Sequence, residues 1–155
     1  MSREYDDILG HMQNLLDENA IKKLQYKYAR LMDDGFCKGN IRARELAHLW
    51  SEDGVWDGGE SGRYHGRKAI EEFFIEHALH VKFANHYVAN EEISVTGSTG
   101  KSRCLLLVPA TFIVNGEEVE EWLFVAWHNS FVKLDDGAWY FSELIAEVFK
   151  HGSHG

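Results

Sequence analysis

The sequence contains few cysteines and almost no proline, two and one respectively in 155 residues. Two cysteines cannot build a disulfide framework or a cysteine zinc site, so we expect Cys37 and Cys104 to be reduced thiols without a chemical role. No stretch of about 18 apolar residues, the length of a membrane-spanning helix, occurs. The first residues also lack a basic segment followed by an apolar one, so the sequence predicts a mature cytoplasmic protein without a membrane partner.

Basic side chains are also scarce, because 16 Lys and Arg stand against 25 Asp and Glu, for a formal net charge of -9. Phosphate backbones bind clustered cations, so nucleic acid is not an expected partner. The chain is instead 45% hydrophobic and 13% aromatic. A chain of this length buries about two-thirds of its unfolded surface in one core, so residues 1–155 are expected to form a single domain.

Helical periodicity dominates the first half. The spacing predicts a helix over 18–34, with Asp17 as its N-cap and Gly35 as its end. Residues 1–17 form an N-terminal extension in which a short extra helix is expected. The helix over 18–34 is predicted because apolar side chains recur there at helical spacing: Ile21, Leu24, Tyr28, Leu31 and Met32. The next helices are predicted from Asn40 to Trp50 and from Lys68 to His80, with short strands at 55–56 and 63–65 between them.

The second half predicts long strands, at 83–97, 101–114, 117–134 and 138–149, before a flexible tail at 150–155. Asn115-Gly116 is typical of a tight hairpin turn. Helices followed by an antiparallel meander predict an α+β fold. Strands this long require bends, so we expect a curved sheet that wraps around the N-terminal helices as a cone and leaves a cavity.

Two side chains on these elements are suited to acid–base chemistry. Strand alternation places His86 with Ala84 and Val88 on an inward face. Asp33 lies about 140° around its helix from Tyr28, which leaves two interpretations open. Either Asp33 is a solvated carboxylate, or the helix is buried on both sides and Asp33 reaches His86.

The third long strand carries an aromatic face that fits a pocket wall or an ordinary core. Without a bulge, its members share one face and Trp127 lies on the other: Trp122, Phe124, Ala126, His128, Ser130 and Val132. Trp50 and Trp56 are ambiguous in the same way. A metal site at His65, His77, His80 and His86 is a weaker alternative, because no cysteine or carboxylate stands at ligand spacing.

Three segments resemble the SnoaL-like branch of the nuclear transport factor 2-like superfamily: Ala20–Asp33, Leu46–Trp56 and Tyr64–Ile70. The motifs Asn85-His86-Tyr87 and Asp136–Trp139 extend the match over nearly the whole chain. The resemblance implies a cystatin-like, cone-shaped fold with a mixed or antiparallel sheet, which agrees with the architecture expected from the residue pattern.

Within that branch, a carboxylate ending the first helix and a histidine opening a strand resemble scytalone dehydratase, hexachlorocyclohexane dehydrochlorinase and bile acid 7α-dehydratase. The resemblance implies that Asp33 is the helix carboxylate, His86 the base, and Tyr28 a tyrosine of the bile acid enzyme family. Val108–Ala110 resembles a strand segment of scytalone dehydratase, although Ala110 replaces a second catalytic histidine there. His128 is expected to supply the missing donor.

The sequence therefore predicts a cofactor-independent lyase of the dehydratase type, or an isomerase, acting on a small apolar hydroxylated or carbonyl ring compound. Asp33, His86 and Tyr28 are the expected catalytic residues, and no metal is required. The expected pocket residues are Trp50, Trp56, Phe124, His128 and Val108. Cyclisation, epoxide hydrolysis and dehalogenation stay open because fold does not fix function.

The rival interpretation is a noncatalytic ligand-binding or assembly subunit resembling the small subunit of ring-hydroxylating dioxygenases. It predicts an apolar surface patch and no coupled Asp–His pair. In either case, a homodimer or homotrimer that pairs across the backs of the sheets is expected.

Overall fold

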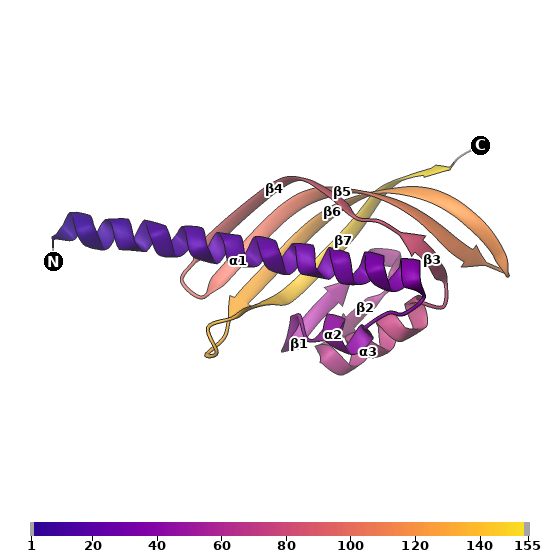
Figure 1. The fold of residues 1–155 in the computed structure, drawn as a ribbon, viewed down its shortest axis with the longest axis horizontal. Coiled ribbons are helices and arrows are strands. Elements are labelled where there is room, and N and C mark those ends of the chain that lie inside the picture. Colours follow the sequence, from indigo (N-terminus) through magenta and orange to yellow (C-terminus); the bar gives the residue numbers. More distant parts are fainter. Residues whose placement is uncertain (1, 154–155) are drawn as a thin grey trace.

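The computed structural model describes residues 2–153. One long helix, α1 (Arg3–Lys38), runs along the length of the protein (Figure 1). The Ser2 side chain caps it by accepting from the main-chain N–H of Tyr5, and Gly39 ends it in the left-handed conformation, with φ of 61°. The predicted end at Gly35 is wrong, as is the separate extra helix. Gly35 stays helical, and a β-carbon there would lie 2.6 Å from Ile41, so this glycine permits close packing.

The other helices are shorter than predicted. They are α2 (Ala43–Ala47) and α3 (Gly66–His77), with a 3-10 turn, η1, at Gly59–Ser61. The predicted helix from Asn40 to Trp50 is wrong at both ends, because α2 begins after Arg42 and Trp50 already opens a strand. Within residues 2–153, no helix is long and apolar enough to cross a membrane.

The strands form one curled sheet in the order β2-β1-β7-β6-β5-β3, with β4 also paired to β5. Their bounds are β1 Trp50–Asp57, β2 Arg63–His65, β3 Val81–Ala84, β4 Tyr87–Thr96, β5 Thr99–Val114, β6 Glu117–Lys133 and β7 Trp139–Ser153. β1 runs parallel to β7, and the other neighbouring strands are antiparallel. The sheet arches over α1, with α2 and α3 below one end (Figure 1), so the α+β cone prediction is confirmed.

Two boundaries differ from the predicted strands. The run 83–97 is broken at Asn85 and His86 into β3 and β4, which pair with different parts of β5. Residues 150–153, predicted to belong to a flexible tail, are paired with β6 as the end of β7. Residues 154–155 of that tail lie outside the described residues.

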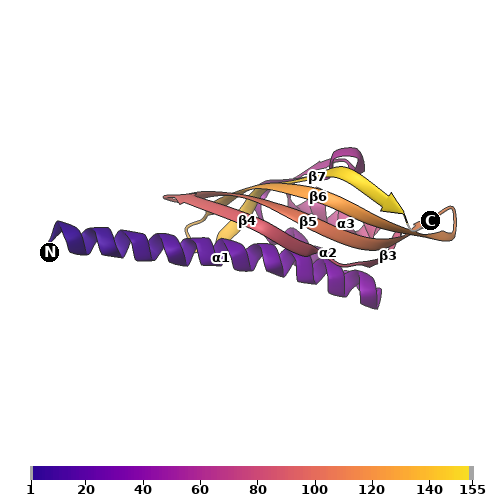
Figure 2. The ribbon, with the colours of Figure 1, turned by 90° about the horizontal axis from the view of Figure 1, so that it is seen from above.

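The two halves of α1 have different surroundings. Every residue from 2 to 16 is exposed, and the helix leaves the sheet in that region (Figure 2). Packing begins at Asp17, which is buried and accepts from the Trp139 indole at 2.9 Å and the Lys133 ammonium at 2.8 Å. Burial alone would raise the pKa of Asp17, but these donors lower it. Asp17 therefore anchors the middle of a helix and is not its N-cap.

Candidate active site

The carboxyl-terminal part of α1 places Asp33 against the break between β3 and β4, where His86 lies. The ring Nδ1 of His86 is 2.6 Å from Oδ1 of Asp33. The main-chain N–H of His86 also donates to the same carboxylate, at 3.1 Å to each oxygen. Asp33 therefore holds both the ring and the backbone of His86.

This contact determines how the imidazole can be used. An ionised carboxylate only accepts hydrogen bonds, so Nδ1 of His86 must be the donor. A neutral ring protonated on Nδ1 leaves Nε2 unprotonated and able to accept a proton. The side chains of His86 and Asp33 are only 13% and 20% exposed, so solvent screens their interaction weakly.

Tyr28 approaches the pair from the interior side of α1. Its ring centroid is 6.4 Å from that of His86, and its hydroxyl oxygen accepts from the Trp56 indole at 3.1 Å. Within residues 2–153, the hydroxyl proton has no hydrogen-bond acceptor, so it is available for donation. Burial raises the pKa of Tyr28 well above its ordinary value, and the charge of Asp33 adds to this, so the phenol stays neutral.

Aromatic rings close the interior around Tyr28 and His86. Trp127 on β6 lies 6.1 Å from His86 between ring centroids, and Trp50 lies 5.6 Å from Tyr28. Trp50, Trp56 and Val108 are all buried in the common core, so three of the predicted pocket residues lie on the inner side of the sheet. Sequence reasoning missed Trp127, although strand alternation already separated it from Trp122 and Phe124.

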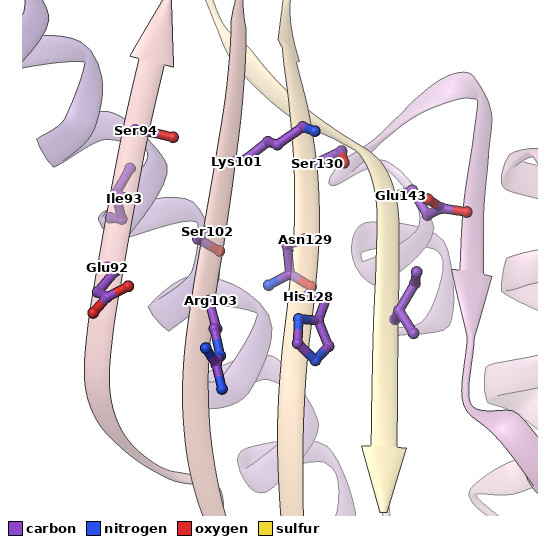
Figure 3. A pocket seen from close by; sticks show the side chains of 11 residues that line it. Glu92, Ile93, Ser94, Lys101, Ser102, Arg103, His128, Asn129, Ser130 and Glu143 are labelled. Carbon is purple, nitrogen blue, oxygen red and sulfur yellow. The ribbon is translucent and has the colours of Figure 1, made fainter.

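Phe124 and His128 do not lie with His86, which corrects the predicted pocket. From Val125 to Phe131 every odd-numbered residue of β6 is buried, and Ala126 is the one even-numbered residue there that is also buried. The even-numbered side chains of this stretch therefore face away from α1. Figure 3 shows His128 on that outer face, and its Nε2 lies 3.6 Å from a carboxylate oxygen of Glu147. Phe124 contacts Phe149 at 6.4 Å between ring centroids. Aromatic content misled the assignment because both faces of β6 carry aromatic residues.

A pocket of about 330 Å³ adjoins the Asp33–His86 pair. The residues that complete its lining are Tyr26, Ala29, Arg30, Tyr87 and Val88. Tyr26 and Ala29 share the helix face of Asp33, and sequence reasoning did not identify Arg30 or Tyr87 as pocket residues. The helix period could have identified Arg30, because this residue precedes Asp33 by three positions and therefore lies beside it on the helix surface.

A larger hollow of about 560 Å³ lies on the outer face of the sheet, away from α1 (Figure 3). Lys101, Arg103 and His128 line it together with the carboxylates Glu92 and Glu143. Its charges are mixed and partly satisfied, since Glu143 accepts from Arg63 at 2.7 Å. This hollow is larger than the pocket at Asp33, but the tight carboxylate–imidazole contact belongs to the smaller pocket.

The histidines considered as metal ligands lie in different surroundings. His77 stacks on Phe73 at 5.0 Å, at an angle of 22° between the rings. Burial, with the nearby charges of His80 and His86, lowers the pKa of His77 to about 4, so its ring is neutral at neutral pH. Across residues 2–153, no three or more His, Cys, Asp or Glu side chains gather as a metal site.

The fold and the pair together define a protein of one long helix and a curled sheet, in which a carboxylate on the helix holds a histidine at the break between β3 and β4. The SnoaL-like domain family matches residues 13–145, most of the chain, so the protein belongs to that family. A search of curated proteins finds no match.

Solved structures with the same fold cover almost the entire chain. A putative scytalone dehydratase from Novosphingobium aromaticivorans has a TM-score of 0.75 and 19% identity, covering 91% of this chain and 89% of its own. LinA has a TM-score of 0.79 and 16% identity, covering 91% of both chains. A nuclear transport factor 2-like protein with a cystatin-like fold, also from Novosphingobium aromaticivorans, has a TM-score of 0.71 and 21% identity. The match covers 94% of this chain and 90% of that protein's chain. At these identities the likeness shows the shared fold.

Proposed function

We propose that the protein is a cofactor-independent lyase of the dehydratase type in which Asp33 and His86 form the acid–base pair. The observation that carries this proposal is the 2.6 Å contact between Asp33 Oδ1 and His86 Nδ1, because it leaves Nε2 as the basic nitrogen. The names of similar structures, a putative scytalone dehydratase and a dehydrochlorinase, agree with elimination chemistry.

The proposed reaction is an elimination of water. His86 Nε2 takes a proton from a carbon that a neighbouring carbonyl makes acidic, and the electrons of that C–H bond form the new C=C bond. The C–O bond to the leaving hydroxyl breaks, and the imidazolium returns its proton to that oxygen, which departs as water. Asp33 stabilises the imidazolium between these two steps and keeps the ring oriented.

Tyr28 does not line the pocket at Asp33, so it is the proposed hydrogen-bond donor to a substrate that reaches the interior side of His86. A neutral buried phenol with a free proton can stabilise the oxygen on which negative charge develops. The indole of Trp56 supports this role, because its N–H donates to the phenol oxygen and makes the phenol a better donor. Tyr28 would then contribute to kcat more strongly than to substrate binding.

The proposed substrate is a small, mostly apolar ring compound with a hydroxyl or carbonyl group. Aromatic and aliphatic side chains surround the pair, with Tyr87, Val88 and Ala29 on the pocket side and Trp127 on the interior side. The same base would also serve an isomerase, which returns the proton to another carbon. No step of either reaction requires a metal ion or an organic cofactor.

The noncatalytic rival fits the site less well. It predicts an uncoupled carboxylate and imidazole, whereas Asp33 makes both ring and main-chain hydrogen bonds to His86. A subunit that only binds or assembles gains nothing from a basic nitrogen held in one orientation. The rival also predicts that substitution of His86 leaves every measurable activity unchanged.

The test is a screen of hydroxylated aromatic, steroid and polyketide compounds, followed by NMR of the product and of deuterium uptake from D₂O. His86→Ala is expected to abolish both turnover and exchange at the acidic carbon. Asp34→Asn is the matched control, because Asp34 is the adjacent residue, its side chain is 59% exposed, and within residues 2–153 its ion-pair partner is Lys38 alone. Equal activity of His86→Ala and Asp34→Asn on a turned-over substrate would rule out the proposed base.

A further inference from the structure

The exposed half of α1 carries an apolar stripe that nothing within residues 2–153 covers. Its members, which we call the amino-terminal stripe, are Tyr5, Ile8, Leu9, Met12, Leu15 and Leu16. Each of these side chains is between 44% and 66% exposed. An isolated large apolar side chain on a surface is ordinary, but six on one helix form a continuous patch, which marks an interaction site.

The stripe faces away from the protein's own sheet. An α-helix turns about 100° per residue, so Met12 lies about 160° around the axis from Tyr28, whose side chain is buried under the sheet. On the stripe's side of the helix, the second half of α1 carries charged residues such as Lys23 and Arg30. The apolar face of α1 therefore changes sides near Asp17, and the domain cannot cover the stripe by bending the helix inward.

The spacing of the stripe is that of helices that pair with one another. Positions 5, 8, 12 and 15 follow the alternation of three and four residues that forms a coiled-coil seam, and 9 and 16 widen it on one side. Figure 2 shows this part of α1 extending past the strands, where another helix has access to it.

We propose that the amino-terminal stripe binds the same stripe of a second copy of this chain, in a two-fold, antiparallel helix pair. Such a surface is self-complementary, as a two-fold interface requires. Each copy contributes six large apolar side chains that are 44% to 66% exposed, so the pair forms an interface at the small end of the range for specific contacts.

Charge favours the antiparallel orientation. The first turns carry Glu4, Asp6 and Asp7. An antiparallel pair that joins the two stripes keeps these acidic turns apart, at opposite ends of the contact, and opposes the two helix dipoles. A parallel pair would place the acidic turns together. The pairing also differs from an assembly across the backs of the sheets, and the experiment separates the two.

The first experiment is sedimentation velocity on the full chain over a wide range of concentration. The wild type is expected to dimerise, and Met12→Gln/Leu16→Gln is expected to raise the dimer dissociation constant by about 100-fold or more, because each copy loses two apolar contacts. Glutamine keeps the helix propensity of these positions. Ile75→Gln/Leu79→Gln is the control, since both side chains are more than half exposed but lie outside the stripe.

Either of two results would overturn this proposal. One is a wild-type chain that stays monomeric at every concentration. The other is a stripe variant that dimerises as tightly as the wild type, which would favour pairing across the sheets. Circular dichroism of the variant checks that α1 stays helical, so that loss of dimer is not a loss of the helix.

A distance measurement tests the orientation. Glu4→Cys in a Cys37→Ser background carries one spin label per copy, because Cys104 is 1% exposed and is protected from labelling. Because the stripe spans residues 5–16, the antiparallel pair places position 4 of one copy beside position 17 or 18 of the other, so the two labels lie about 20 Å apart along the axis. A close pair of labels would contradict the antiparallel arrangement.

Discussion

Asp33 accepts hydrogen bonds from two parts of the same residue, the ring Nδ1 of His86 at 2.6 Å and its main-chain N–H at 3.1 Å. The main-chain bond fixes the break between β3 and β4 against α1, and the ring bond fixes the tautomer. One carboxylate thus joins the helix, the strand break and the proposed base.

Asp33→Asn is expected to reduce kcat by about 10³-fold or more, because an amide can donate to Nδ1 and favours the wrong tautomer. The melting temperature is expected to change little, since asparagine retains an acceptor for the main-chain N–H. Steady-state kinetics and thermal denaturation check the two parts, with Asp34→Asn as control. A fall in melting temperature that accounts for the lost activity would indicate a structural role.

Tyr28→Phe is expected to lower kcat by about 10- to 10³-fold with a smaller change in KM, if Tyr28 donates to the developing oxygen charge. It also leaves the buried Trp56 N–H without its acceptor, at a cost of about 1–3 kcal/mol in the free energy of unfolding. The double variant Tyr28→Phe/Trp56→Phe removes both polar groups. It should recover part of the stability without recovering activity; recovery of activity would contradict the proposed donor.

Gln25 is the centre of a buried polar cluster beneath the sheet. It is 0% exposed, accepts from Ser102 at 2.5 Å and Asn129 at 2.9 Å, and donates to Glu91 at 2.7 Å. Gln25→Ala should lower the free energy of unfolding by about 2–4 kcal/mol, because it leaves a cavity and buried groups without partners. Urea denaturation measures this. Asn14→Ala, at an exposed position on the amino-terminal half of the same helix, should change it by less than about 1 kcal/mol.

His77 should make the protein less stable in mild acid. Its folded pKa of about 4 lies below the ordinary value of 6.5, because burial disfavours the charged ring. Between these values the unfolded chain binds the proton and the folded chain does not, so stability falls as pH drops from 6.5 towards 4. His77→Phe should remove about 1–3 kcal/mol of this pH dependence, measured by urea denaturation at pH 7 and pH 5. His80→Gln, at an exposed neighbouring position, should retain it.

The helical and strand periods of the sequence were sufficient to predict a curved α+β fold and the order of its elements. These periods exist because each helix and strand buries one face. They could not predict that α1 continues through Gly35, since that glycine serves a tertiary contact with Ile41. They also could not orient β6, where apolar and aromatic residues occupy both faces. The aromatic richness of the outer face made Phe124 and His128 resemble pocket residues.

The candidate site was likewise predictable from the sequence only in part. Helix geometry left Asp33 either solvated or facing His86, and the break after Ala84 decides between these by bringing His86 to the helix. No local signal marks that break, because residues 83–97 have strand character throughout. The catalytic roles of Asp33, His86 and Tyr28 stay predictions until a substrate is found.

Nitrogen-15 NMR of the histidine-labelled protein tests the central claim most directly. The His86 resonances are assigned by their loss in His86→Gln and recorded at a pH where the ring is neutral. The account predicts a proton on Nδ1 and none on Nε2, with the tautomer ratio shifting in Asp33→Asn. A His86 ring that is protonated on Nε2 in the wild type would contradict it.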